Sequence, residues 1–190
     1  RPTADFLNSV RSHLKNTYNY ETGAYQGYDN VSDNTRFVAR IDWNIARNHR
    51  FNVRYSQVES KSPSFASTSR SPLTGYGSGN GRQGNNHLWF ENSNYFQESN
   101  FYSLAAELNS TFGKFANTFR GTFTHQNDPR STNSSIFPLV DILDGTNAAA
   151  PGSVLTTFGY EPFTYGNLRD VKTTSFVDYI TFQTGKHNWT

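Results

Sequence analysis

Hydrophobic residues recur with two different spacings, one near the start of the chain and another in the rest of it. Within residues 3–20, apolar side chains recur at spacings of three and four, which predicts one short amphipathic helix. Thr3 is the expected N-cap, because its hydroxyl can accept a backbone N–H hydrogen bond at the helix start. The apolar positions are Phe6, Leu7, Val10 and Leu14. From Thr35 onward the period becomes two, which is typical of strands with one apolar and one polar face.

The alternating segments predict strand pairs that are joined in turn by short turns and by long aperiodic loops. We expect a helix-bearing loop at 1–34, hairpins at 35–58 and 100–126, long loops at 59–99 and 127–172, and the start of a third hairpin at 173–190. Loops of this length are uncommon in compact soluble domains. Transmembrane β-barrels, in contrast, combine short turns on one side with long loops on the other.

The alternation separates charged from apolar side chains within the predicted strands. A tilted strand of about 9–11 residues crosses a bilayer, so we expect the charged set to face a polar lumen and the apolar set to face lipid. The expected lumen-facing residues are Arg36, Arg40, Arg54, Glu107 and Arg120. The expected lipid-facing residues are Phe37, Ile41, Val53, Leu104, Phe119 and Phe123.

The strand near residue 178 alternates less clearly, because apolar residues fall on both of its faces. We expect Asp178 to face the lumen together with Phe176, Ile180 and Phe182. This register leaves Val177 and Tyr179 toward lipid, and it avoids a cost of about 2 kcal/mol for a carboxylate near the membrane midplane.

Aromatic residues lie beside each predicted short turn. Such positions are typical of the aromatic girdle at a membrane–water interface. The expected girdle residues are Trp43, Phe51, Phe112 and Trp189.

Composition narrows the function classes. Only 34% of the 190 residues are hydrophobic, while 16% are aromatic, and the mean hydropathy is -0.72. A soluble core would therefore be thin, and the many aromatic residues favour strands. The net charge is +2 without a basic cluster, so we expect no nucleic-acid partner. The chain has no cysteine, which excludes disulfides and thiol catalysis.

No motif for catalysis or for a transmembrane helix stands out. The His, Asp and Glu residues show no spacing typical of a metal site or of an acid–base pair, so we expect no enzyme activity, cofactor or metal. No apolar run approaches the roughly 20 residues that a membrane-spanning helix needs. The chain starts at Arg1 without an initiator methionine, and we expect a mature product or a fragment.

Three segments carry a resemblance to a known family. They are "DNTRFVARIDWNIARNHRFNVRYS", "FYSLAAELNSTFGKFANTFRGTFTHQNDPRS" and "TTSFVDYITFQTGKHNWT". They resemble the barrel of TonB-dependent outer-membrane receptors, most closely the Oar-like subgroup with a carboxypeptidase-regulatory-like domain. The resemblance implies an all-β, antiparallel up-and-down barrel of about 22 strands with a plugged lumen, of which this chain would supply about five or six.

The resemblance also implies a function and partners. The protein would be a transporter of a Gram-negative outer membrane, passing a nutrient or polypeptide with energy supplied through TonB. Its partners would be outer-membrane lipid, the remaining barrel strands, a plug domain, the TonB system and a surface lipoprotein. Neither the plug domain nor a TonB-binding segment is recognised in the 190 residues.

The long loops contain aromatic residues among asparagines, a combination that suits a peptide or glycan ligand. The candidate binding residues are Trp89, Phe90, Tyr95, Tyr160 and Tyr165. The interpretation that we favour is that these aromatic residues pack the loops on one another.

A soluble protein is the alternative hypothesis. A β-sandwich adhesin or carbohydrate-binding module would bury the face with Phe37, Ile41, Phe119 and Phe123 against a second sheet. It would also favour shorter connections than the two long loops. A requirement for detergent would separate this class from the barrel.

Overall fold

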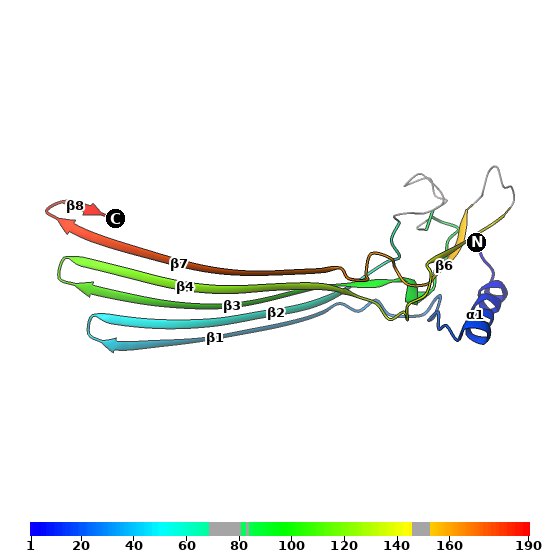
Figure 1. Ribbon diagram of the computed structural model, residues 1–190, viewed down its shortest axis with the longest axis horizontal. Helices are drawn as coiled ribbons and strands as arrows, with labels where there is room; N and C mark the ends of the chain where they lie inside the picture. Colours follow the sequence, from blue (N-terminus) through cyan, green and yellow to red (C-terminus); the bar gives the residue numbers. More distant parts are fainter. Residues whose placement is uncertain (69–80, 83, 146–152) are drawn as a thin grey trace. The chain divides into compact units, whose positions relative to one another are not determined.

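The chain divides into two compact units, each built from three stretches of sequence. The computed structural model describes residues 1–68, 81–82, 84–145 and 153–190 (Figure 1). We call residues 33–61, 98–129 and 168–190 the strand unit, and residues 1–32, 62–97 and 130–167 the loop unit. Antiparallel β-structure predominates and α1 is the one α-helix of the described residues, which confirms the predicted all-β class.

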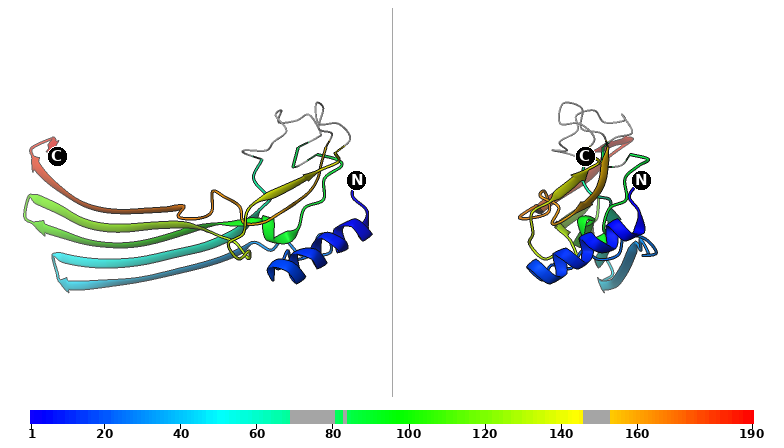
Figure 2. Two further views of the ribbon diagram at one scale, coloured as in Figure 1. Left: turned by 45° about the vertical axis from the view of Figure 1, so that its right-hand side comes forward. Right: turned by 90° about the vertical axis from the view of Figure 1, so that its right-hand side faces the viewer.

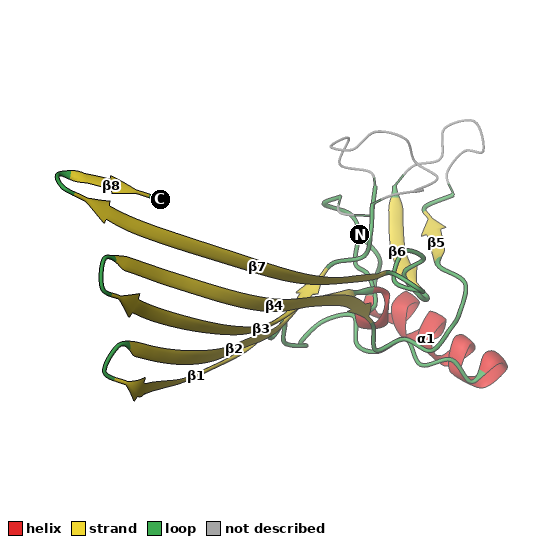
Figure 3. Cartoon of the chain, turned by 60° about the vertical axis from the view of Figure 1, so that its left-hand side comes forward, coloured by secondary structure: helices red, strands yellow, loops and turns green. Residues whose placement is uncertain are grey.

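The strand unit contains nearly all of a single six-stranded sheet with the strand order β1-β2-β3-β4-β7-β8 (Figures 1 and 3). Neighbours in sequence are therefore neighbours in the sheet, as in a meander. The strands are β1 (Asp33–Ala46), β2 (His49–Ser64), β3 (Tyr95–Phe112), β4 (Phe115–Ser131), β7 (Leu168–Thr184) and β8 (His187–Trp189).

Short turns join the strands in three pairs, and they lie at one end of the sheet (Figure 1). Gly113 and Gly185 adopt left-handed φ values of 58° and 57° in the second and third turns. Glycine accepts this conformation without a Cβ clash, and the turn types most common in two-residue hairpins contain it. The first turn, at Arg47 and Asn48, follows a register shift between Asn44 and Ala46.

Most strands are longer than the alternation predicts. β3 begins at Tyr95 and not near residue 100, and β7 begins at Leu168 and not near residue 173. Polar pairs such as His125↔Lys172 and Asn127↔Asp170 continue the ladder beyond the apolar positions. Backbone hydrogen bonds hold these pairs, so the ladder can extend where the side-chain pattern no longer indicates a strand.

The loop unit is organised around α1 (Ala4–Tyr18) (Figure 2). The Thr3 side chain accepts a hydrogen bond from the Phe6 backbone N–H, which confirms the predicted N-cap. Asn19 ends the helix in the left-handed conformation. The helix buries its apolar face in a core cluster with residues from the later loop segments; the buried members are Leu7, Leu14, Tyr20, Phe90 and Phe158.

The loop unit also contains strands that were not expected. β5 (Val140–Leu143) and β6 (Val154–Phe158) pair within residues 127–172, where the sequence predicted an aperiodic loop. A single 3-10 turn, η1 (Glu91–Ser93), lies in the other long loop. Both faces of β6 are largely buried, so its sequence carries no alternation to reveal it. No helix in the described ranges is both long and apolar enough to cross a membrane.

Candidate functional site

The strand register sorts the side chains of the strand unit onto two faces of opposite character. Arg40 pairs with Arg54, while the next residue, Ile41, pairs with Val53. Paired residues project to the same side and consecutive residues to opposite sides. The sheet therefore has a charged face and an apolar face.

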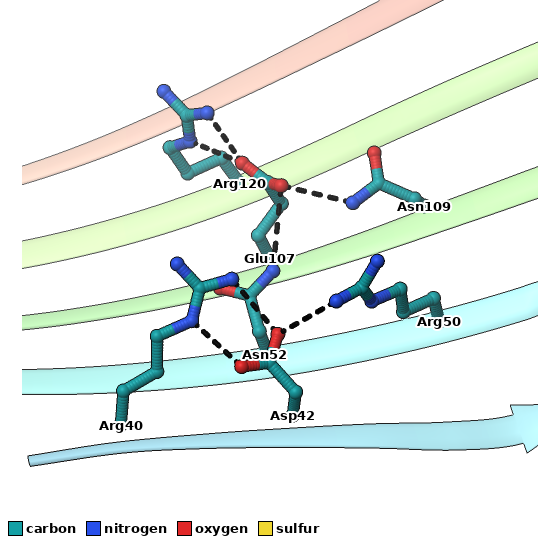
Figure 4. A network of polar contacts seen from close by, with 7 residues as sticks. All are labelled: Arg40, Asp42, Arg50, Asn52, Glu107, Asn109 and Arg120. Atoms are coloured by element: carbon teal, nitrogen blue, oxygen red, sulfur yellow. Dashed lines mark hydrogen bonds and ion pairs between the residues drawn. The ribbon is translucent and has the colours of Figure 1, made fainter.

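Asp42 connects two arginines on the charged face (Figure 4). The Arg40 Nε and Nη2 atoms donate to the two Asp42 carboxylate oxygens at 2.8 Å each. Arg50 donates to the same carboxylate at 3.4 Å. The three side chains come from the adjacent strands β1 and β2, so this contact ties the first hairpin together.

Glu107 is the second centre of the charged face (Figure 4). Its carboxylate accepts hydrogen bonds from Asn52 at 3.4 Å, from Asn109 at 2.9 Å and from the Arg120 Nε at 2.7 Å. A second Arg120 nitrogen contacts the same oxygen. Glu107 thereby links β2, β3 and β4 through side chains.

All five residues that were expected to face a lumen share the charged face. Arg54, Glu107 and Arg120 line one cleft together with Arg40, and Arg36 projects to the same side of β1, where its Nε donates to Asn34 at 3.0 Å. Their common face follows from the register. That this face borders a lumen stays a prediction.

The apolar face carries the six residues that were expected to face lipid. Tyr102 donates to Glu59 at 2.8 Å, which places Leu104, two residues on, on the same face as Val53. Most of these side chains are exposed, with Ile41 at 66% and Phe119 at 44%. The shared face follows from the register, while contact with lipid stays a prediction.

The four girdle candidates also lie on the apolar face, close to the short turns. Trp43 pairs with Phe51, and Trp189 pairs with Phe182. The Phe112 ring lies 5.2 Å from that of His49. The structure thus brings these aromatic side chains to one end of one face; their role at an interface stays a prediction.

The expectation for Asp178 is wrong. Asp178 pairs with Phe119 and lies on the apolar face, while Val177 pairs with Arg120 and lies on the charged face. The opposite register would move Phe176 and Phe182 away from the aromatic rings that they contact, Phe119 at 6.2 Å and Phe115 at 4.6 Å. The Asn117 amide donates to the Asp178 carboxylate at 2.5 Å, which reduces the cost of this position.

The five loop aromatics do not form one binding surface. Phe90 is fully buried in the core, so its assignment as a candidate ligand contact is corrected. Trp89 is partly buried between Phe65 and His87, and Arg130 lies 5.0 Å above the Tyr95 ring.

The two other candidates lie in the segment after β6. Tyr160 is half-buried, and burial raises the pKa of its hydroxyl, with a smaller contribution from Glu161. Tyr165 is 76% exposed. The preferred interpretation, that loop aromatics serve packing, therefore holds for Phe90 and not for Tyr165.

A buried polar cluster in the loop unit carried no sequence signal. Arg82 and Asp141 form an ion pair at 2.8 Å with both side chains only 4% exposed. Thr157 donates to Asp141 at 2.7 Å and contacts the His87 Nε2 at 2.9 Å. Burial is the main reason why the pKa of His87 falls to about 4. Arg82 and His87 are distant in sequence from Asp141 and Thr157, so no local motif could indicate this cluster.

Comparisons of the chain with protein-family models, with curated proteins and with solved structures gave no match. Function must therefore be argued from the two faces of the strand unit and from the resemblance of its hairpins.

Proposed function

We propose that the strand unit is part of the wall of a transmembrane β-barrel in the outer membrane of a Gram-negative bacterium. The apolar face contacts lipid and the charged face borders a polar lumen. The observation that supports this assignment is the coexistence, on one sheet, of an exposed apolar face and a hydrogen-bonded charged face. Soluble monomers rarely leave a large contiguous apolar surface open to water.

The height of the apolar band fits a membrane. On β4 the apolar face carries Phe115, Phe119 and Phe123, with Asn117 and Gly121 between them, and the polar residues His125 and Asn127 follow on the same face. Eight residue steps cover about 26 Å along a strand, or about 20 Å along the membrane normal at the usual tilt. Outer-membrane barrels have an apolar band about 25 Å tall.

The sheet edges indicate that further strands are needed. Among the described residues, β1 and β8 each pair on one side only. Open sheet edges do not occur in the hydrocarbon region of a bilayer, and single-chain barrels start at about eight strands. The strand unit would therefore be closed by strands outside these residues.

We further propose that the barrel belongs to a TonB-dependent receptor, which passes a nutrient or polypeptide through a plugged lumen. The support is the resemblance of the three hairpin segments to the Oar-like subgroup, together with a charged face suited to water or to a plug. The plug domain, the TonB system and a surface lipoprotein would be the protein partners.

Cysteine labelling tests the membrane assignment with a matched pair of neighbours. Thr174 lies on the apolar face opposite Phe123, and Ser175 lies on the charged face opposite Thr122; both are exposed. The 190 residues contain no cysteine, so Thr174→Cys and Ser175→Cys each add one label site to them, and labelling is compared with that of the protein without either substitution. The full-length protein in outer-membrane vesicles is treated with a lipid-phase maleimide and, separately, with a membrane-impermeant one.

The barrel requires the lipid-phase probe to modify Thr174→Cys and the impermeant probe to modify Ser175→Cys. In a soluble sandwich the apolar face is an internal core, so Thr174→Cys would resist both probes. Protection of Thr174→Cys, or labelling of Ser175→Cys from the lipid phase alone, would refute the barrel.

The TonB assignment needs its own measurement. The full-length protein, purified in detergent, should bind the isolated periplasmic domain of TonB. If no binding is detected while Thr174→Cys reacts from lipid, the barrel stands and the TonB-dependent assignment is wrong.

A further inference from the structure

We propose that Arg40, Arg54 and Arg120 form a binding site for an oxyanion, the carboxylate or phosphate group of a soluble substrate. The three arginines line a cleft of about 340 Å³ on the charged face, together with Asn52, Glu107 and Thr122. The transport role of this site rests on the proposed function, and it narrows the substrate class to anionic solutes. The binding itself depends only on the strand unit.

The cleft has more guanidinium groups than carboxylates to pair with them. Arg40 is held by Asp42 and Arg120 by Glu107. Arg54 makes no hydrogen bond or ion pair within the described part of the chain. Glu107 is the one carboxylate among the lining residues, against three arginines, so the cleft carries excess positive charge.

Arg54 also lies directly beside another positive charge. Arg40 and Arg54 are direct cross-strand partners, and like charges at such positions are destabilising. An anion between the two side chains would turn this repulsion into two attractive contacts. Asp42 offsets the charge of Arg40, whereas Arg54 has no hydrogen bond or ion pair among the described residues, so the charge that an anion would meet here is chiefly that of Arg54.

Donor groups remain open to a ligand after the internal contacts are made. The Arg40 and Arg120 side chains are 51% and 54% exposed. Each uses its Nε and Nη2 atoms for the carboxylate contact, which leaves Nη1 outside these bonds (Figure 4). In Arg54 all N–H groups of the planar guanidinium are open to a ligand. Guanidinium groups recognise carboxylate and phosphate in a bidentate manner, so both oxyanions are suitable probes.

The experiment measures citrate and inorganic phosphate binding to the full-length protein in detergent by isothermal titration calorimetry, with spermidine as a cationic control. Arg54→Gln removes the unpaired guanidinium and should weaken anion binding about tenfold, the typical effect of losing charge-assisted hydrogen bonds. Arg36→Gln is the matched control, because it removes the same charge from the same face but outside the cleft. We expect it to change affinity by less than about twofold.

A second variant is expected to have the opposite effect on anion affinity. Glu107→Gln removes the carboxylate of the cleft and frees Arg120, so anion affinity should rise severalfold. Arg54→Gln relieves a like-charge contact and should leave the protein folded, which a urea unfolding curve of each variant verifies.

Three results would overturn the site: no binding of either anion, equal losses in Arg54→Gln and Arg36→Gln, or binding of spermidine in place of the anions. Cysteine labelling separates this failure from that of the proposed function. Lipid labelling of Thr174→Cys without anion binding would leave the barrel and remove the site, whereas anion binding without lipid labelling would leave the site and remove its transport role.

Discussion

Gly159 is at a position where both the backbone conformation and the nearby backbone atoms exclude a residue with a Cβ atom. Its φ is 109°, and a Cβ at this position would lie 2.0 Å from the Pro138 carbonyl oxygen. Gly27 has a φ of 74° but no atom within 4 Å of such a Cβ. The two glycines therefore separate the cost of a left-handed φ from the cost of a backbone clash.

Gly159→Ala should destabilise the loop unit far more than Gly27→Ala. The left-handed conformation alone costs about 1–2 kcal/mol, and Gly159→Ala must in addition displace the backbone at Pro138. Thermal unfolding of both variants measures the difference. Equal melting temperatures would show that the Pro138 carbonyl moves freely.

His87 should make stability depend on pH. Burial keeps the imidazole neutral in the folded protein down to a pKa of about 4, although Asp141 opposes this shift and Arg82 favours it. The ordinary pKa of histidine is 6.5. Between this pH and about 4, His87 is therefore protonated in the unfolded chain but stays neutral in the folded protein. Stability from this group is therefore full above pH 6.5 and is lost as the pH falls toward 4, by up to about 3 kcal/mol.

The measurement is the free energy of unfolding at several pH values for the wild-type protein and His87→Gln. The variant should lose the slope between pH 4 and 6.5 that His87 causes. An unchanged slope would assign the pH dependence to other groups.

Strands are where the sequence is most informative. Period-two alternation placed the hairpins of β1–β2 and β3–β4, because one face of each is consistently apolar. The register of β7 could not be derived, since Phe176, Asp178 and Ile180 share one face while Val177 and Tyr179 share the other. Only the pairing with β4, where Phe119 and Phe115 contact aromatic partners, decides it.

The charged cluster of the candidate site was predictable only in part. Alternation indicated that Arg40, Arg54, Glu107 and Arg120 would share a face, but not which arginine would lack a carboxylate partner. Asp42 lies beside Arg40 because the two residues are two positions apart on β1, whereas the stagger between β3 and β4, which the alternation does not reveal, sets Glu107 beside Arg120. Likewise, β6 escaped prediction because both of its faces are largely buried.

β1 offers a matched pair for testing the faces at the level of assembly. Ile41 and Val38 are both 66% exposed, both are branched aliphatic residues, and they lie on opposite faces of one strand. In the proposed barrel, Ile41→Arg should reduce the amount of assembled protein in the outer membrane, because an arginine on a face that contacts lipid costs about 2–4 kcal/mol near the midplane. Val38→Arg should assemble nearly as well as the wild type.

Heat-modifiable migration on gels quantifies the folded fraction in both variants. Equal assembly of Ile41→Arg and Val38→Arg would contradict the assignment of the apolar face to lipid.

At the scale of the whole molecule, the loop unit forms one core from stretches that are far apart in the chain. Phe90, Leu7 and Phe158 come from three different stretches and belong to one buried cluster. Phe90→Ala should cost about 3–5 kcal/mol, as other large aromatic deletions in cores do. Tyr165→Ala, at a 76% exposed position, should change stability by less than about 0.5 kcal/mol.

Hydrogen exchange locates the effect. Because α1 packs in the same cluster through Leu7 and Leu14, Phe90→Ala should also speed exchange of the α1 amides. If those amides stay as protected as in the wild type, the helix does not depend on this core.

The shared core also bears on how the loops of this protein can diversify. Surface loops usually vary one at a time, because each tolerates change without its neighbours. Here a foreign loop in place of residues 62–97 alone would remove Phe90 and leave Leu7, Leu14 and Phe158 without their common partner. An exchange of loops would therefore preserve this core only when residues 1–32, 62–97 and 130–167 are replaced together.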